Sequence, residues 1–424
     1  MRGHSLYYWR KPVLLGMALV GLSALIAACK PANTVPALEA DPRPSLNERT
    51  YNAIWDALET RYVYTGSLDN DLAHLRAEYD ERLSSDMPPG EFNDLIAGML
   101  LDLGGQAVLT PRLERINQAL ANTSSYYGIG AYVAFRSEPQ PRVILLDIIP
   151  GSPADSSGLQ AHDAVLAVDG SPILQEEATT AASRMRGPAG TDVVLTVLSP
   201  GASPREVTVT RQAIDIVPGR LVAVYDPTVG VGYIRFPRII NTDISSQLLD
   251  RVSEIRGQVG FRGLVLDLRI ATSSGGNFPL GDLLTLFSSG PMGQVYTIDT
   301  ADDLVITGQN YLDSQTFPLA ILIGPDTTGF PEILAASLQE KGRAILVGLP
   351  TVGEIEGTTS VDLPNGSMLQ LPTSTFRTQG GTEVGLVGVQ PDLLIDSDWD
   401  AVQDGDDAVL NAAAAALLSG RANQ

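Results

Sequence analysis

Apolar side chains recur every three or four residues between residues 46 and 120, which is the spacing of amphipathic helices. Three apolar stripes stand out, each suited to burying one face of a helix. They comprise Tyr51, Ile54, Trp55, Leu58 and Tyr62; Leu72, Leu75, Tyr79 and Leu83; and Phe92, Leu95, Ile96, Met99, Leu100 and Leu103. We expect residues 46–120 to form a small helical bundle in which the stripes pack together. His74 lies off its stripe and is expected at the surface.

From residue 121 to residue 212 the helical spacing gives way to short runs of β-favouring residues separated by glycine and proline. The predicted strands are 143–148, 165–168, 193–198 and 206–210. Short strands with frequent turns indicate a separate β-rich domain.

The third stretch, residues 213–400, alternates buried strands with helices. Its clearest strands are almost entirely apolar, as expected of strands covered on both faces. They are 264–268, 319–323 and 344–347. Pro331 and Gly342 mark the ends of a helix over 331–341, because proline suits the first turn and glycine the position after the last. With a C-terminal helix and tail over 401–424, the predicted fold class is α+β with several domains.

The N-terminus begins with basic residues and continues with an apolar run that ends at Ala28. A run of about 16 residues is short for a membrane span, which needs roughly 20, and is typical of a signal peptide. Small residues before Cys29 resemble the lipobox of bacterial lipoproteins, in which the cysteine is lipidated and begins the mature chain. This implies a signal peptide over 1–28, lipid on Cys29 and a Pro/Ala-rich tether over 29–45.

We therefore expect a protein anchored to the cell membrane and facing outside the cytoplasm. The alternative is a cleaved signal peptide followed by an incidental cysteine.

Composition narrows the choice of partners and cofactors. The chain has 424 residues and a formal net charge of −21, with 28 Lys and Arg against 49 Asp and Glu. This balance argues against nucleic acid as a partner, because phosphate binding needs clustered cations. A single cysteine cannot form an internal disulfide or a zinc site built on several cysteines. We predict no metal site and no cofactor.

Glycine-containing sequences of the β-rich stretch occur in a characteristic order. They are Tyr127-Gly128-Ile129-Gly130-Ala131, Gly151-Ser152-Pro153-Ala154, His162-Asp163 and Arg186-Gly187-Pro188. Together they resemble a PDZ domain of bacterial processing proteases, here over 121–212. The resemblance implies that backbone amides at Gly128, Ile129 and Gly130 hold the terminal carboxylate of a peptide, which adds as an extra strand.

Arg186 matches the arginine of the family's PDZ domain; the resemblance adds it to the peptide-binding residues, and we expect it to face the core. His162 stands where such domains usually carry glycine, which indicates a structural turn. The alternative is a PDZ domain that only packs against its neighbour.

Segments of the third stretch resemble a known protease family in the same order along the chain. Gly230–Phe236 and Gly263–Arg269 match two strands, and Gly388–Asp392 matches a closing motif, of the carboxyl-terminal processing peptidases. These enzymes are also called tail-specific proteases, and the resemblance implies a crotonase-like α/β core. Gly275 and Gly276 stand at the position of the family's oxyanion turn.

The family cleaves peptide bonds with a serine nucleophile and a lysine base. Counted from Glu332, the resemblance puts the nucleophile position at Gly329. The base position, after Thr351-Val352-Gly353, is Glu354, and the family's supporting glutamine becomes Thr358. The resemblance thus implies a peptidase scaffold in which both catalytic side chains are replaced.

Elementary chemistry agrees with this interpretation. A serine–lysine pair needs a desolvated lysine whose pKa falls from about 10.4 toward neutrality. The lysines are Lys11, Lys30 and Lys341, and the last lies at the far end of the 331–341 helix, about 15 Å from its start. Glu354 would add negative charge where an oxyanion has to develop. Outside the predicted signal peptide, which contains His4, a serine–histidine triad could draw only on His74 and His162, which lie outside the core.

Three hypotheses follow for the function. The first is a membrane-anchored pseudopeptidase that binds extended or C-terminal peptides of other proteins. The second is an active serine-type endopeptidase with an atypical nucleophile and Glu354 or Glu356 as base. The candidate nucleophiles are Thr327, Thr328, Ser273 and Ser274. The third is a cell-surface scaffold for partner proteases, and the sequence leaves a homo-oligomer open.

Overall fold

The computed structural model describes residues 44–65, 72–116, 127–175, 180–215, 218–240, 243–273, 278–403 and 406–420. The predicted signal peptide, Cys29 and the tether as far as residue 43 lie outside these residues, as do Ser274, Gly275 and Gly276. Within the described residues, no helix has the length and apolar character needed to cross a membrane.

Three helices follow Ser45: α1 (Leu46–Arg61), α2 (Leu72–Arg82) and α3 (Pro89–Asp102). Ser45 starts α1 with a capping box, in which its Oγ accepts a hydrogen bond from the N–H of Glu48 and its own N–H donates to the Glu48 carboxylate. The three predicted apolar stripes contribute to one buried cluster, and His74 is exposed.

These helices also pack against a sheet that the sequence analysis did not predict. Leu363, Leu369 and Leu371 belong to the same buried cluster as the helical stripes. Strand β1 (Val108–Thr110), which lies in the range predicted as helical, pairs antiparallel with β18 (Met368–Thr378). The N-terminal helices and the C-terminal half of the chain therefore share one hydrophobic core.

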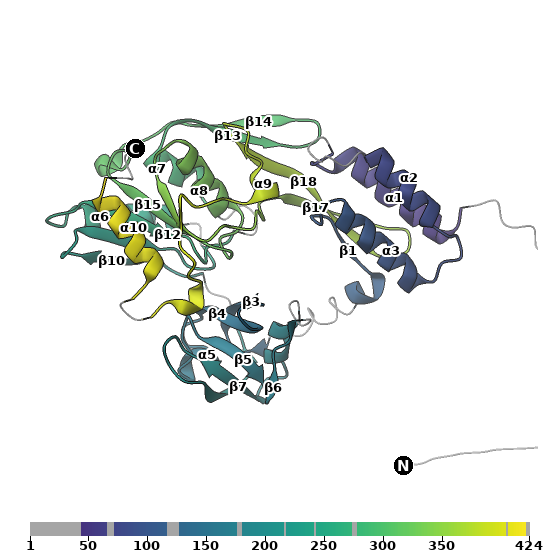
Figure 1. Ribbon diagram of the computed structural model, residues 1–424, viewed down its shortest axis with the longest axis horizontal. Helices are drawn as coiled ribbons and strands as arrows, with labels where there is room; N and C mark the ends of the chain where they lie inside the picture. The colour runs from purple at the N-terminus through teal and green to yellow at the C-terminus, as the bar shows by residue number, and fades with distance from the viewer. Residues whose placement is uncertain are drawn as a thin grey trace, which may run out of the picture. The chain divides into compact units, whose positions relative to one another are not determined.

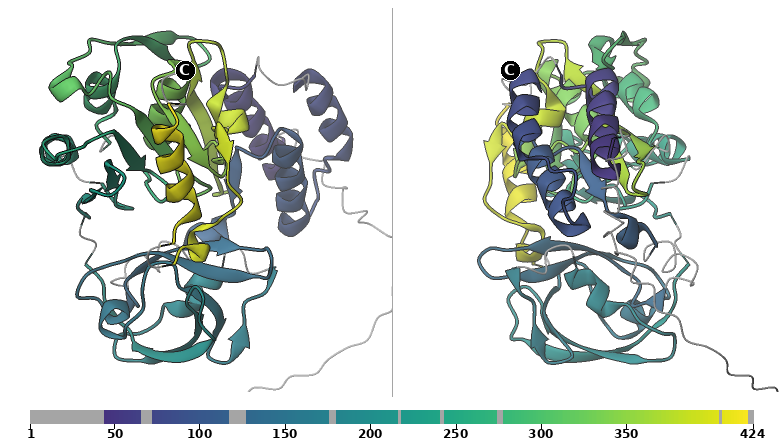
Figure 2. Two further views of the ribbon diagram at one scale, coloured as in Figure 1. Left: turned by 60° about the vertical axis from the view of Figure 1, so that its left-hand side comes forward. Right: turned by 90° about the vertical axis from the view of Figure 1, so that its right-hand side faces the viewer.

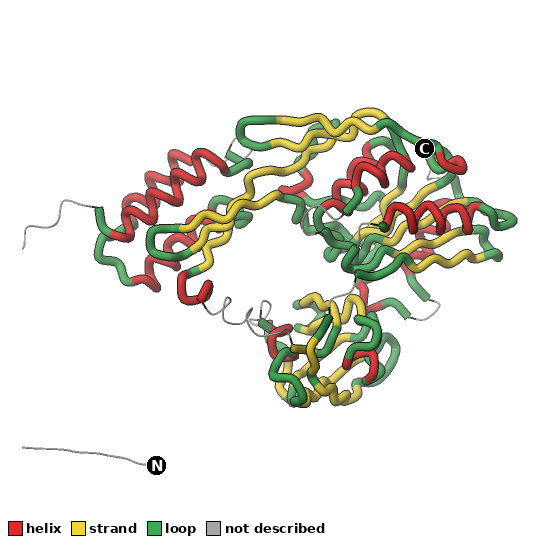
Figure 3. Tube along the Cα trace, turned by 180° about the vertical axis from the view of Figure 1, so that it is seen from behind, coloured by secondary structure: helices red, strands yellow, loops and turns green. Residues whose placement is uncertain are grey.

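The complete sheet has the strand order β1-β18-β13-β14, with β17 also paired to β18. Figure 3 shows its long strands in yellow beside the red helices of the N-terminal region. The remaining strands are β13 (Gly290–Tyr296), β14 (Ala301–Ile306) and β17 (Gly357–Asp362).

The β-rich stretch forms a sheet with the order β3-β4-β5-β7-β8, so β3 is an edge strand. The four predicted strands correspond to β4, β5, β7 and β8, each of which begins within one residue of the prediction, whereas the six-residue strand β3 was not predicted. The elements are β2 (Tyr127–Gly128), β3 (Ala131–Arg136), β4 (Arg142–Ile148), α5 (Pro153–Ser156), β5 (Ala164–Val168), β6 (Ser171–Pro172), η2 (Ala181–Met185), β7 (Asp192–Leu198), β8 (Arg205–Thr210) and β9 (Gln212–Ala213).

The third stretch is built on a six-stranded sheet with the order β10-β11-β12-β15-β16-β19, parallel except for β10 (Figure 1). Its strands are β10 (Val222–Asp226), β11 (Val231–Arg235), β12 (Gly263–Asp267), β15 (Leu319–Ile323), β16 (Ile345–Gly348) and β19 (Leu393–Leu394).

Helices cover both faces of this sheet, which explains its continuous apolar strands. In β12, Leu264 belongs to the cluster formed with α6 (Ile244–Arg256), α7 (Leu280–Phe287) and α8 (Phe330–Glu340). Its neighbour Val265 belongs to the opposite cluster, formed with α10 (Ala408–Leu418). Successive side chains of a strand point to opposite faces, so both must be apolar. Figure 2 shows α10, in yellow, lying against these strands.

Three short elements complete the core: η3 (Tyr311–Asp313), α9 (Val384–Val387) and η4 (Trp399–Ala401). The last of them joins the β-rich domain to the core. The indole N–H of Trp399 donates to the carbonyl oxygen of Leu146 at 3.0 Å, and His162 Nδ1 lies 2.7 Å from the carbonyl oxygen of Trp399. The His162 backbone has a φ of 75°, the left-handed region that favours glycine. His162 therefore forms a turn, as predicted, and also an interdomain contact.

Candidate functional site

The predicted nucleophile position lies at the start of helix α8. Gly329 is the N-cap residue, with φ 77° and ψ −136°, a conformation that side chains rarely adopt. Its N–H donates to Glu332 Oε2 at 3.0 Å, and Pro331 occupies the first turn. Helix α8 therefore starts with a glycine that permits the unusual backbone conformation, a proline that rigidifies the first turn and a glutamate that caps the helix.

The space beside Gly329 is filled by Ser273. A Cβ atom on Gly329 would lie 2.6 Å from the carbonyl oxygen of Ser273 and 2.7 Å from its Oγ. Ser273 Oγ also accepts a hydrogen bond of 2.8 Å from the N–H of Phe330. Since the first N–H groups of a helix have no partner within the helix, this bond satisfies one that an external ligand would otherwise use.

The predicted base position lines the same cavity as Gly329. This cavity has a volume of about 290 Å³, and the exposed side chain of Glu354 forms part of its wall. The described lining residues are Ser273, Val295, Gly329, Phe330, Ile333, Glu354, Ile355, Glu356, Gly357, Ser374, Thr375 and Phe376. Thr358 is exposed on strand β17 and is not among them. The structure thus brings Gly329 and Glu354 together and leaves Thr358 apart.

A buried carboxyl group, that of Glu332, connects the two sides of this cavity. Its Oε2 binds the N–H of Gly329, and its Oε1 accepts hydrogen bonds from Thr351 Oγ1 at 2.5 Å and from the N–H of Gly353 at 2.7 Å. Burial raises the pKa of Glu332 to about 7, against the effect of these donors, and the nearby charge of Glu354 raises it further. The position of Glu332, three residues after the N-cap, is the sequence signal that could have identified this role.

A second carboxylate in the cavity is held by the N-terminal region. Tyr64, just after α1, donates a hydrogen bond of 2.6 Å to Glu356 Oε1, and its hydroxyl lies 3.0 Å from Thr375 Oγ1. Burial raises the pKa of Glu356. A Cβ atom on Gly385 would lie 2.0 Å from the Tyr64 hydroxyl, so glycine is needed there. No local sequence pattern indicated the contact between Tyr64 and Glu356.

The alternative nucleophiles differ in their surroundings. Thr327 is fully buried and donates to the carbonyl oxygen of Leu268 at 2.8 Å, and Thr328 Oγ1 lies 2.6 Å from Thr272 Oγ1. Both hydroxyls thus serve local structure. Ser274 lies outside the described residues, so Ser273 is the described candidate that lines the cavity.

Lys341, the lysine among the described residues, does not reach this cavity. Lys341 is the C-cap residue of α8, whereas Gly329 is its N-cap. The 11 residues of α8 lie between them, so the two ends are about 18 Å apart.

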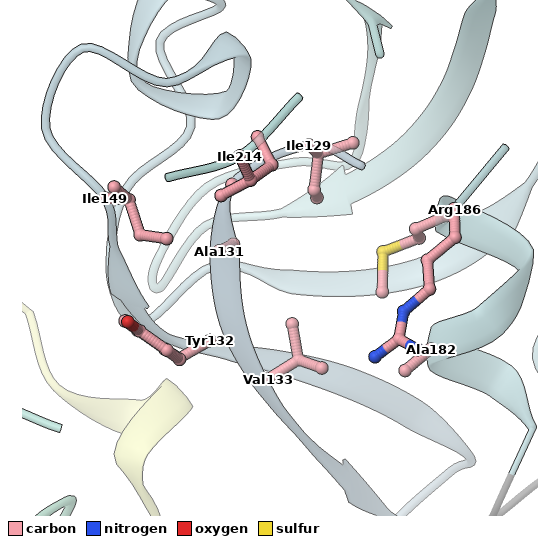
Figure 4. A pocket seen from close by; sticks show the side chains of 10 residues that line it. Ile129, Ala131, Tyr132, Val133, Ile149, Ala182, Arg186 and Ile214 are labelled. Atoms are coloured by element: carbon pink, nitrogen blue, oxygen red, sulfur yellow. The ribbon is translucent and has the colours of Figure 1, made fainter. Parts of the chain in front are cut away.

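A second cavity, of about 440 Å³, lies along the start of edge strand β3 (Figure 4). Its lining residues are Ile129, Gly130, Ala131, Tyr132, Val133, Ile149, Ala182, Met185, Arg186 and Ile214. Three of the four residues predicted to bind peptide therefore line one groove, and Gly128 precedes them in strand β2. Arg186, expected to face the core, lines this groove instead, and its side chain extends toward Val133 and Ala182.

Backbone hydrogen bonds hold the glycine loop, residues 128–130, in place. The carbonyl oxygen of Ile129 accepts a hydrogen bond of 2.7 Å from the N–H of Ala154, and that of Gly130 accepts one of 3.0 Å from Ile149. A Cβ atom on Gly130 would lie 2.3 Å from the Cβ of Ser152, and the Gly130 φ is 84°. Only glycine fits this position.

The groove and the cavity are linked through Arg136, the last residue of β3. Its guanidinium forms ion pairs with Asp326, three residues before Gly329, and with Asp398 at 2.6 Å. These side chains are at most 21% exposed, so solvent screens the ion pairs less than it would at the surface. The edge strand thus ends at the loop that leads into α8.

Comparison with known proteins agrees with this architecture. Residues 230–395 match peptidase family S41, and residues 144–199 match the PDZ domain. The chain is 31% identical over 296 residues to the carboxyl-terminal-processing protease of Picosynechococcus sp., covering 67% of this chain and 69% of that protein. The chain belongs to peptidase family S41.

Other relatives of this S41 protein carry similar names. It is 30% identical to the carboxyl-terminal-processing protease of Synechocystis sp., covering 66% of this chain and 65% of that protein. Among solved structures, a photosystem II D1 C-terminal processing protease gives a TM-score of 0.56 at 25% identity, covering 89% of this chain and 98% of that one. The predicted family, PDZ domain and mixed α/β multidomain fold are confirmed.

We predict that Gly329→Ala will lower the free energy of unfolding by about 2–4 kcal/mol, because the disfavoured backbone conformation and the overlap with Ser273 both act against it. Gly342→Ala, at the other end of α8, is the matched control. Gly342 has a φ of 62° with nothing within 4 Å of an added Cβ, so about 1–2 kcal/mol is expected. Urea denaturation measures both, and equal losses would contradict the crowding at Gly329.

We also predict a pH dependence that comes from Glu332. Between its ordinary value of 4.5 and its folded pKa of about 7, the folded state holds more protons than the unfolded state, so the free energy of unfolding falls as pH rises. Glu332→Gln removes this contribution, whereas the exposed Glu91→Gln leaves it. Denaturation curves at pH 5, 6, 7 and 8 provide the comparison. An unchanged slope in Glu332→Gln would contradict the assignment.

Proposed function

We propose that this chain is a lipid-anchored, non-catalytic member of its family that binds extended or C-terminal peptides of other proteins. The observation that carries the proposal is Gly329. It offers no nucleophile at the start of α8, and Ser273 occupies the space that a side chain there would need.

The remaining groups of the cavity support the same conclusion. Acyl transfer needs an activated nucleophile and donors aimed at the developing oxyanion. Here the N–H of Phe330 is already bonded to Ser273, and Glu354 brings negative charge to the same cavity. A carboxylate with an ordinary pKa of about 4.3 is also a weak base toward a hydroxyl group.

Two features of the β-rich domain support peptide binding. No described strand pairs with the outer edge of β3, and the glycine loop at its start borders an apolar groove. An extended peptide can pair with such an edge, while side-chain pockets select its sequence. The relatives are named as proteases that process carboxyl termini, which makes C-terminal segments the first class of ligand to test.

Ser273 is the specific basis for a second candidate function. Its hydroxyl lines the cavity with Glu354 and lies at the N-terminus of α8. Hydrolysis through this group would make the chain an active serine-type endopeptidase with an atypical nucleophile.

We predict that the purified full chain in detergent will not cleave an unfolded protein substrate and will not be labelled by a fluorophosphonate probe. Such a probe reacts with activated serine hydroxyls, and none is expected here. Cleavage or labelling that disappears in Ser273→Ala would contradict the proposal and establish the second candidate.

The same preparation should bind a peptide with a free C-terminus, and amidation of that terminus should weaken binding by about tenfold or more. Gly130→Ala should abolish binding, because its Cβ would overlap with Ser152. Gly151→Ala is the matched control, since Gly151 also has a positive φ, of 75°, but open space around it. Calorimetry with equal affinities for both peptide forms would contradict terminal recognition.

We propose further that lipid on Cys29 holds the protein at the membrane, outside the cytoplasm. The motif before Cys29 supports this proposal. In detergent phase partition after bacterial expression, the unaltered chain should enter the detergent phase, and Cys29→Ala should move to the aqueous phase. Equal partition of the two would favour an incidental cysteine.

A further inference from the structure

The cavity beside Gly329 is acidic. Glu354 and Glu356 both line it, and its described lining residues include no lysine or arginine. Apolar side chains, among them Phe330 and Phe376, form much of the remaining wall. A cavity with apolar walls and negative charge suits a ligand that has an aliphatic stem and a cationic head.

The two carboxylates are fixed differently. Glu356 is half-buried, and the Tyr64 hydroxyl binds its Oε1 at 2.6 Å. Because burial disfavours its charged form, a cation brought into the cavity would gain a poorly solvated partner. Glu354 is exposed at the wall of the cavity. The half-buried carboxylate of Glu356 and the exposed carboxylate of Glu354 could therefore contact a bound cation from two sides.

No cation of the described residues neutralises this pair by direct contact. Neither Glu354 nor Glu356 forms a salt bridge there, although the charge of Arg238 acts on Glu354 from a distance. The Arg238 guanidinium donates instead to the carbonyl oxygens of Ile270 and Asp326, at 3.1 and 2.8 Å. The negative charge inside the cavity is therefore available to a ligand.

We propose that this cavity binds the cationic side chain of a lysine or arginine in the peptide that the PDZ groove captures, an inference that rests on the proposed function. The ammonium or guanidinium group would lie between Glu354 and Glu356, and its aliphatic stem would pack on the apolar wall. The cavity thus adds a basic residue to the recognition of a C-terminus.

The course of strand β3 indicates where in the peptide that residue falls. A peptide with its terminus at Gly130, paired antiparallel to β3, runs toward Arg136. Arg136 binds Asp326, and Gly329 of the cavity follows three residues later. Six residues of strand span about 20 Å, so the basic residue lies at least about six positions before the C-terminus.

The test measures the affinity of the full chain, in detergent, for peptides of about 16 residues that end in valine. Each peptide carries one lysine, which is placed at successive positions from about six to about twelve residues before the C-terminus. Norleucine replaces lysine in a second set, because it keeps the stem and removes the charge. At the best position, lysine should bind at least about tenfold more tightly than norleucine. The Glu354→Gln/Glu356→Gln double variant should lose that difference, and the exposed Glu91→Gln control should keep it.

The outcomes separate the inference from the proposed function. If norleucine peptides bind as tightly as lysine peptides at every position while amidation still weakens binding, the acidic site is refuted and peptide capture stands. If the lysine preference persists in a folded double variant, the cation binds elsewhere and the inference is wrong. If no peptide with a free C-terminus binds, both are overturned.

Discussion

A single buried carboxyl group, that of Glu332, sets how the start of α8 meets the loop after β16. It holds the N–H of Gly329 with one oxygen, and Thr351 and Gly353 with the other. A buried carboxyl group is costly unless its hydrogen bonds are made, so these segments cannot separate without a large loss of stability. Gly329 on one wall of the cavity and Glu354 on the other are consequently held in a fixed relation.

The same framework extends to the peptide groove. Asp326 lies in the loop before α8 and is paired with Arg136 at the end of β3. On the opposite side of the cavity, Tyr64 brings the N-terminal helices into contact with Glu356. The loop regions around the cavity are thus fixed from three directions. Such support from several elements is what keeps a binding site preorganised when its chemistry changes.

Local patterns explain which parts of this structure were predictable. Strands such as β15 were predicted from sequence because both faces are covered, and Pro331 and Gly342 marked α8 to within one residue. The exposed strand β17 carries mainly polar residues, and β14 has only a short apolar run after Asp302 and Asp303, so neither gave such a signal. Motif spacing predicted that Gly329 and Glu354 belong to one site. The bond between Tyr64 and Glu356 joins residues 292 positions apart, so no local pattern could indicate it.

The negative charge in the cavity favours the binding of a cationic ligand and opposes the catalysis of peptide hydrolysis. Enzymatic hydrolysis of a peptide bond depends on hydrogen-bond donors that stay free for a developing negative charge, and the first N–H groups of a helix can serve as such donors. At the start of α8 the N–H of Phe330 is already engaged by Ser273, in the ground state, and two glutamates face the same space. An environment that stabilises a cation destabilises an oxyanion by the same electrostatics. Serine alone at position 329 would therefore not restore cleavage, because the acidic wall would still oppose the transition state and Lys341, at the far end of α8, could not act as its base.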